Sequence, residues 1–194
     1  MNENHARLCP SPEWAEHLHT DVLPVVTDGV DLGDEMLEIG PGPGASTEWL
    51  RHRVQHLVAV EHDEDACTRL SERMAGMNVR VVHADATSLP LEADTFDSAA
   101  SFTMLHHVPT PELQDALFAE VARVLRSDGV FVAADSLASD GLAEFHEGDT
   151  YNPIDPTTLE ARLRRAGFAD VSITVADSLM FVARPRRVNS LPAE

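Results

Sequence analysis

The chain has 194 residues, 43% of them apolar, and a formal net charge of −19, with fourteen arginines and no lysine. This length suits one domain with a full core, and no apolar run approaches the ~20 residues of a bilayer span. Together with an N-terminus that lacks the pattern of a secretory signal, this predicts a cytoplasmic protein without a membrane partner. The acidic balance disfavours nucleic acid, whose binding depends on Lys and Arg, and the absence of lysine excludes a P-loop and a lysine Schiff base.

Short apolar runs alternate with helical patterns along the chain, which is typical of a parallel sheet with crossover helices. The first helix is predicted over residues 11–30, where Ser11 is a natural N-cap and Pro12 suits the first turn. Strands are predicted at 35–40, 56–61, 79–85, 96–103 and 130–136, and helices between them at 46–54, 63–76 and 110–129.

The last third changes character. Residues 137–153 have mixed signals that predict a loop with one short helix, and residues 155–167 form a helix with Gly167 just past its end. Residues 168–185 read as two strands joined near Asp177 and Ser178, an antiparallel pair at the sheet edge. Only the termini, roughly residues 1–8 and 186–194, are predicted to be disordered. The expected fold is therefore three-layered α/β, with a mostly parallel seven-stranded sheet whose last strand is antiparallel.

A glycine-rich turn follows the first strand and opens a helix. It reads E-x-G-x-G-x-G from Glu38 to Gly44, and Gly40, Gly42 and Ala45 also satisfy the dinucleotide pattern G-x-G-x-x-[GA]. Glu61 lies 21 residues after Gly40, at the end of the next strand, where a carboxylate can accept hydrogen bonds from both hydroxyls of a ribose. The pair predicts an adenosine-type ligand, and both an NAD enzyme and a methyltransferase would place an acid here.

A third sequence element distinguishes an NAD enzyme from a methyltransferase and favours the methyltransferase. Asp85, with Ala86 beside it, ends the third predicted strand, and "FDSAASFTMLHHV" and "LFAEVARVLRSDGVFVAAD" follow in order. Here the chain resembles class I S-adenosylmethionine-dependent methyltransferases of the small-molecule type, which have a Rossmann-like fold. The resemblance covers about residues 34–184. It implies a helical N-terminal lid segment over 1–33, a methyltransferase domain over 34–186 and a flexible tail over 187–194.

The resemblance also implies which residues bind S-adenosyl-L-methionine and release S-adenosyl-L-homocysteine. Glycine-turn residues would line the methionine and ribose portion, Glu38 would reach the methionyl amino group through water, and an acid on each of the next two strands would hold ribose and adenine. Backbone carbonyls at the end of the fourth strand would face the amino group or sulfonium, and one histidine would lie against the adenine. The predicted set is Glu38, Gly40, Pro41, Gly42, Gly44, Glu61, His62, Asp85, Ala86, Ser101 and Phe102.

Methyl transfer from a sulfonium is an in-line displacement that needs close alignment more than a strong catalyst. A base near neutral pKa still helps an amine or phenol acceptor, and the candidates are His106, His107 and His146. Trp14, Met104, His106 and Tyr151 are the candidate acceptor-binding residues. A divalent-cation site from His106, His107, His146 and Asp135 would suit a catechol acceptor. No H-x-x-x-H or H-E-x-x-H spacing supports it, so no metal is predicted.

Other classes are weaker. A short NAD(P) oxidoreductase needs a Tyr-x-x-x-Lys pair, which a chain without lysine does not have, and an aminopropyltransferase needs an acidic, aromatic pocket beyond the fourth strand. A non-catalytic or non-methylating protein that acts as a binding or scaffold subunit is the principal alternative. No large cap domain is inserted, which favours a small-molecule acceptor and allows a homodimer to complete the pocket.

Overall fold

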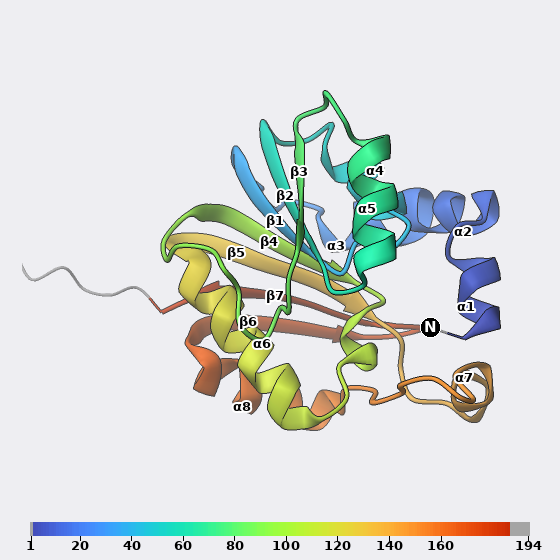
Figure 1. Cartoon of the computed structure of the whole chain (residues 1–194). Coiled ribbons are helices and arrows are strands. Elements are labelled where there is room, and N and C mark those ends of the chain that lie inside the picture. The colour runs from blue at the N-terminus through green and yellow to red at the C-terminus, as the bar shows by residue number, and fades with distance from the viewer. Residues whose placement is uncertain (1, 187–194) are drawn as a thin grey trace, which may run out of the picture.

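The computed structural model describes residues 2–186 (Figure 1). Its strands are β1 (Glu35–Ile39), β2 (His56–Glu61), β3 (Val79–His83), β4 (Phe96–Phe102), β5 (Leu125–Asp135), β6 (Phe168–Val175) and β7 (Leu179–Pro185). The helices are α1 (Glu3–Leu8), α2 (Pro12–His17), the π-helical η1 (Leu18–Val22), α3 (Leu23–Val26), α4 (Ala45–Leu50), α5 (Glu64–Arg73), the 3₁₀ turn η2 (Leu105–His107), α6 (Pro111–Val124), α7 (Asp140–Phe145) and α8 (Pro156–Ala166).

The seven strands form one sheet in the order β3-β2-β1-β4-β5-β7-β6. Strands β1 to β5 run parallel, whereas β7 pairs antiparallel with both β5 and β6. This confirms the predicted fold class, including the antiparallel last strand. Strands β2 and β3 lie on one side of β1, and β4 and β5 lie on the other side. The strand order therefore reverses at β1, between β3 and β4 in the sequence. In open α/β sheets, ligands bind beyond the carboxyl ends of the strands at such a switch point.

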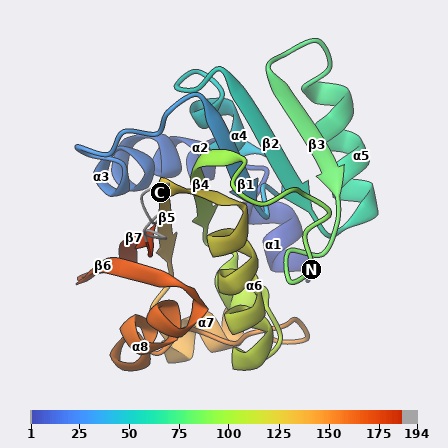
Figure 2. The same ribbon diagram turned by 90° about the vertical axis from the view of Figure 1, so that its left-hand side faces the viewer.

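Helices cover both faces of the sheet (Figure 2), which explains the near-continuous apolar character of the central strands. Phe131 and Ala133 pack with residues of α6 and α8 on one face. Val130 and Val132, which alternate with them, pack with η1, α3 and α4 on the other face, and α5 covers β2 there. The N-terminal segment thus belongs to the same core as the sheet, through Leu18, Leu23 and Val26 among others.

The N-terminus differs from the prediction in two ways. Residues 3–8 are helical rather than disordered, because the Asn2 side chain accepts a hydrogen bond from the His5 N–H and caps α1. The single helix predicted over 11–30 is divided into α2, η1 and α3, with Pro24 in the first turn of α3, where its missing N–H is tolerated.

The boundary between the long helix and the fifth strand also differs from the prediction. Helix α6 ends at Val124 instead of Gly129, because β5 begins at Leu125 and pairs there with Phe96 of β4. The loop after β5 contains one short helix, α7, as predicted. The predicted tail at 187–194 lies outside the described residues. Within residues 2–186, none of the helices has both the length and the apolar character that crossing a bilayer demands.

Candidate functional site

The glycine turn between β1 and α4 depends on backbone conformations that only glycine adopts readily. Gly40, Gly42 and Gly44 have φ of +67°, +50° and +79°. Gly40 also lacks room, since a Cβ there would lie 2.2 Å from Met104 Cγ. Around Gly42, by contrast, a Cβ would meet nothing within 4 Å, so its backbone borders open space. An exposed backbone with positive φ at the start of a helix can accommodate a ligand.

Glu61, at the end of β2, lies against this turn. Its Oε2 accepts a hydrogen bond from the Gly42 N–H (3.0 Å) and its Oε1 accepts one from the Asp63 N–H (2.9 Å). Gly40 in turn donates its N–H to the Val60 carbonyl (2.9 Å). Hydrogen bonds therefore join the end of β2 to the glycine turn, and the Glu61 carboxylate is part of this connection.

Glu38 lies beneath the turn and is almost completely buried. Its carboxyl accepts hydrogen bonds from the Ser46 hydroxyl and from Thr47 Oγ1 (2.6 Å), both in the first turn of α4. Burial raises the pKa of Glu38 to about 7, although the two hydroxyl donors act in the opposite direction. The group therefore changes its protonation state near neutral pH.

The third predicted acid sits at the same edge. Asp85 and Ala86 follow β3, which pairs with β2. The Asp85 Oδ1 accepts hydrogen bonds from the N–H and the hydroxyl of Thr87 (2.8 Å each), first the backbone and then the hydroxyl holding the pKa of the carboxyl below its usual range. Asp85 and His62 are both exposed, and the His62 carbonyl accepts a hydrogen bond from the His83 ring. The carboxyl ends of the neighbouring strands β2 and β3 thus carry Glu61 with His62 and Asp85, respectively.

The predicted residues at the end of β4 are buried. Ser101 and Phe102 are 0% and 5% exposed, and Phe102 packs in the core with η1 and α4. The Ser101 hydroxyl has no hydrogen-bond partner among the described residues.

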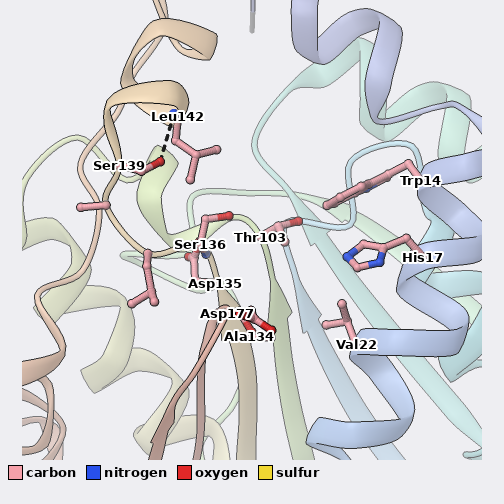
Figure 3. Close-up of a pocket in the computed structure, with 13 residues that line it drawn as sticks. Trp14, His17, Val22, Thr103, Ala134, Asp135, Ser136, Ser139, Leu142 and Asp177 are labelled. Atoms are coloured by element: carbon pink, nitrogen blue, oxygen red, sulfur yellow. Dashed lines mark hydrogen bonds between the residues drawn. The ribbon is translucent and has the colours of Figure 1, made fainter.

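A cavity of about 320 Å³ lies beyond the ends of β4 and β5 (Figure 3). Trp14 and His17 point into it from α2, while Ser139 and Leu142 face them from the start of α7. The remaining lining residues come from η1, the residue after β4, the end of β5 with the loop that follows, and the β6–β7 turn: Val22, Thr103, Ala134, Asp135, Ser136, Leu137, Ala138, Asp177 and Ser178. The volume falls at the small end of the range for ligand pockets.

Thr103 and Met104 connect this cavity to the glycine turn. Thr103 lines the cavity, and the next residue, Met104, packs against Gly40. Thr103 has a φ of +51°, which is strained for a β-branched residue and is held by its N–H bond to the Ala134 carbonyl (2.8 Å). Backbone strain of this kind concentrates at functional sites.

Among the predicted acceptor-binding residues, only Trp14 lines the cavity. Met104 contacts the turn instead, and Tyr151 stacks on His146 with 4.6 Å between ring centroids. The Tyr151 hydroxyl accepts a hydrogen bond from the N–H of Ser139, which does line the cavity. Sequence reasoning missed His17 and Asp177, because only the packing of α2 and of the β6–β7 turn brings them to this cavity, and it missed Thr103, which follows β4.

His106, His107 and His146 come together, and His5 of α1 joins them. We call these four residues the histidine cluster. One ring nitrogen from each lies within 4.8 Å of the others, and three of the residues are buried. His106 bonds through Nδ1 to Asp135, which itself lines the cavity. Burial, with further lowering by His106 and His5, brings the pKa of His107 to about 3, so His107 is neutral and a weak base near pH 7.

Known proteins with similar sequences are methyltransferases. The sequence matches the methyltransferase domain family over residues 37–133. It is 31% identical over 96 residues to an uncharacterized methyltransferase of Mycobacterium bovis, covering 49% of this chain and 48% of that protein. It is also 31% identical over 176 residues to erythromycin 3''-O-methyltransferase of Saccharopolyspora erythraea, covering 78% of this chain and 56% of that protein.

A further relative is named for a different acceptor. Ribosomal RNA small subunit methyltransferase A of Lactiplantibacillus plantarum is 33% identical over 106 residues, covering 50% of this chain and 36% of that protein. The chain spans about half the length, or less, of most of these curated relatives.

Solved structures share the fold. The PH0226 protein of Pyrococcus horikoshii has a TM-score of 0.79 at 20% identity, over 96% of this chain and all of that one. A putative methyltransferase in complex with the Trm112 activator of Haloferax volcanii has a TM-score of 0.75 at 16% identity, over 96% of this chain and 99% of that one. A phosphoethanolamine N-methyltransferase of Haemonchus contortus, in complex with S-adenosylhomocysteine, has a TM-score of 0.71 at 16% identity, over 89% of this chain and 53% of that one. The chain belongs to the class I S-adenosylmethionine-dependent methyltransferases, and S-adenosylmethionine is the cofactor of that family.

Proposed function

We propose that this protein transfers the methyl group of S-adenosylmethionine to a small molecule held in the 320 Å³ cavity. The observation that carries the proposal is the continuity between two features. Gly40 of the glycine turn contacts Met104, and Thr103, one residue earlier, lines the cavity. A cofactor on the turn and an acceptor in the cavity would therefore meet across a single short segment after β4.

The residues of the turn fit the cofactor. The open space at Gly42 lets the backbone approach a ligand, Glu61 presents a carboxylate beside it, and Asp85 stands exposed at the neighbouring strand end. A carboxylate suits ribose hydroxyls, and an exposed acid suits the adenine amino group. Bound there, S-adenosylmethionine would supply the activated methyl group.

The cavity lining favours a neutral or amine-bearing acceptor. Among the described residues that line it are two carboxylates, Asp135 and Asp177, and no arginine. A phosphorylated acceptor would bring negative charge toward these acids, with no arginine among the described lining residues to pair with it, which is unfavourable. The net charge of −19 acts in the same direction against RNA.

Positioning accounts for the rate in this proposal. Correct alignment of two bound reactants can supply about 7–11 kcal/mol of barrier reduction, and Trp14 and Thr103 are placed to align the acceptor. The base role predicted for His106, His107 or His146 stays a prediction, because none of the three lines the cavity. The homodimer and the cytoplasmic location likewise stay predictions from the sequence.

Transfer of a labelled methyl group tests the proposal. The full chain is incubated with methyl-labelled S-adenosylmethionine and either fractionated small metabolites or purified ribosomal RNA. We expect label in a neutral or amine-bearing small molecule and none in RNA. Label in RNA would contradict the acceptor class, and cofactor binding without transfer to either pool would favour the alternative of a binding or scaffold subunit. The Trm112 complex of a structural neighbour makes addition of a protein activator the natural second arm.

A further inference from the structure

The histidine cluster gathers imidazoles from three separate parts of the chain. His5 comes from α1, His106 and His107 from η2 after β4, and His146 from the residue that follows α7. One ring nitrogen from each lies within 4.8 Å of the other three. The rings meet edge-on or tilted rather than stacked, with 4.3–5.2 Å between the centroids of contacting pairs.

Three of these rings are held from outside by their Nδ1 atoms. His106 Nδ1 bonds to the Asp135 carboxylate, His146 Nδ1 donates to the Leu142 carbonyl (2.6 Å), and His5 Nδ1 faces the Asn2 side-chain oxygen (3.0 Å). All three partners are acceptors, so in the neutral form of each ring the proton lies on Nδ1 and the lone pair on Nε2. Metal-binding histidines show this pattern, in which an outer acceptor fixes the tautomer and orients the ring.

The cluster contains a buried nitrogen without a partner. His146 is 3% exposed, and its Nε2 has no hydrogen-bond partner within residues 2–186. No ring within the cluster donates to another ring among the hydrogen bonds of residues 2–186. A buried nitrogen lone pair without a hydrogen-bond donor is unfavourable, and a cation bound to it would remove that cost.

We propose that His5, His106, His107 and His146 bind a Zn²⁺ ion that clamps the N-terminal segment to the wall of the cavity. Neutral imidazoles suit Zn²⁺ and its first-row neighbours, whereas Mg²⁺ and Ca²⁺ require oxygen ligands. Four nitrogens around tetrahedral Zn²⁺ at 2.0–2.1 Å lie about 3.3 Å apart, so the rings would draw together on binding. Four protein ligands leave no open position, which is the coordination of a structural site.

The clamp follows from where the ligands are anchored. Helices α1 and α7 lie beside each other at one end of the sheet (Figure 1), and the Asn2 amide donates to the Phe145 carbonyl (2.8 Å). Asp135 and Leu142, which hold His106 and His146 from outside, both line the cavity. A metal here would therefore join α1 to two segments that line the cavity, the end of β5 and α7. The sequence-based expectation of no metal weighed three of these histidines but placed His5 in a disordered terminus.

Metal binding is tested on the full chain without a polyhistidine tag. The protein is stripped with a chelator and titrated with Zn²⁺ against a competing indicator, and Co²⁺ is used in parallel because its absorption distinguishes tetrahedral from octahedral coordination. The variants are His146→Gln and His5→Gln. The matched controls are His52→Gln and His56→Gln, which make the same change at exposed histidines outside the cluster.

We expect one Zn²⁺ per chain in the parent and both controls, tetrahedral Co²⁺ spectra, and affinity at least ~10-fold lower in the cluster variants. Absence of a stoichiometric site in the folded parent would overturn the proposal, and so would equal losses in cluster and control variants. Circular dichroism of each metal-free variant checks folding, and His5→Gln keeps the test valid if His146→Gln unfolds.

Trypsin tests the clamp separately. Arg7 is exposed on α1, so cleavage after it reports whether the N-terminal segment is held. Zn²⁺ should slow this cleavage in the parent and leave it unchanged in His146→Gln. Equal cleavage of the parent with and without Zn²⁺ would refute the clamp even if the ion binds. Neither readout depends on methyl transfer.

Discussion

Replacement of Glu38 by glutamine should change how stability depends on pH. Burial raises the pKa of this carboxyl from 4.5 to about 7. Between these values the folded state holds a proton that the unfolded state has released, so the parent loses stability as pH rises through this window. Glutamine keeps the shape and can still pair with the Ser46 and Thr47 hydroxyls, but it does not ionise.

The expected size follows from the two pKa values. A folded-state pKa of about 7 against 4.5 costs the parent about 3.4 kcal/mol well above neutral pH, and about 2.5 kcal/mol of this develops between about pH 5 and about pH 8. The carboxyls with lowered pKa values titrate below this window. The histidines are the same in both proteins, so their contribution cancels in the difference between parent and variant.

Urea unfolding of parent and Glu38→Gln at both pH values measures the difference. We expect the variant to gain about 2–3 kcal/mol relative to the parent on going to the higher pH. Glu72→Gln, at an exposed glutamate of α5, shows the effect of losing one surface carboxylate. A change below about 1 kcal/mol, or one equal to that of Glu72→Gln, would refute the reasoning that burial keeps Glu38 protonated.

Three further predictions concern the turn and the cavity. Gly42→Ala should leave the chain folded, at a strain cost of about 1–2 kcal/mol, but weaken the binding of S-adenosylhomocysteine measured by calorimetry. The control Gly29→Ala, also at positive φ with open space around it, should have the same strain cost and bind S-adenosylhomocysteine with the affinity of the parent. Glu61→Ala should abolish cofactor binding in the same assay, and unchanged affinity would remove the assigned ribose contact. Trp14→Ala should lower turnover of the acceptor with cofactor affinity unchanged, and a parallel loss of cofactor affinity would contradict its place in the acceptor cavity.

Local motifs made the fold and the cofactor turn predictable. Gly40, Gly42 and Gly44 have positive φ angles, which glycine adopts readily. Glu61 ends the second strand, which an alternating β–α pattern places beside the first strand. The sheet order follows from the same pattern, because short parallel strands need crossover helices. These features depend on residues close together in the sequence or on neighbouring strands.

The cavity and the histidine cluster depend on packing between distant segments, which one sequence does not reveal. His5 and His146 are 141 positions apart and have no common motif spacing. Thr103 carries no signal of its positive φ, because β-branched residues rarely adopt one. Pro24 is a local sequence signal for the division of the first helix into three pieces. No local signal predicts that this division places Trp14 and His17 over the cavity.

Thermal unfolding with S-adenosylhomocysteine, and with NAD as the comparison ligand, tests the central claim most directly. A ligand present at 100 times its dissociation constant adds about 2.7 kcal/mol, which corresponds to roughly 5–11 °C for a domain of this size. Membership in the S-adenosylmethionine-dependent family predicts a shift of this size with S-adenosylhomocysteine and none with NAD. A shift with NAD alone, or with neither ligand, would contradict the assignment of the glycine turn as the cofactor site.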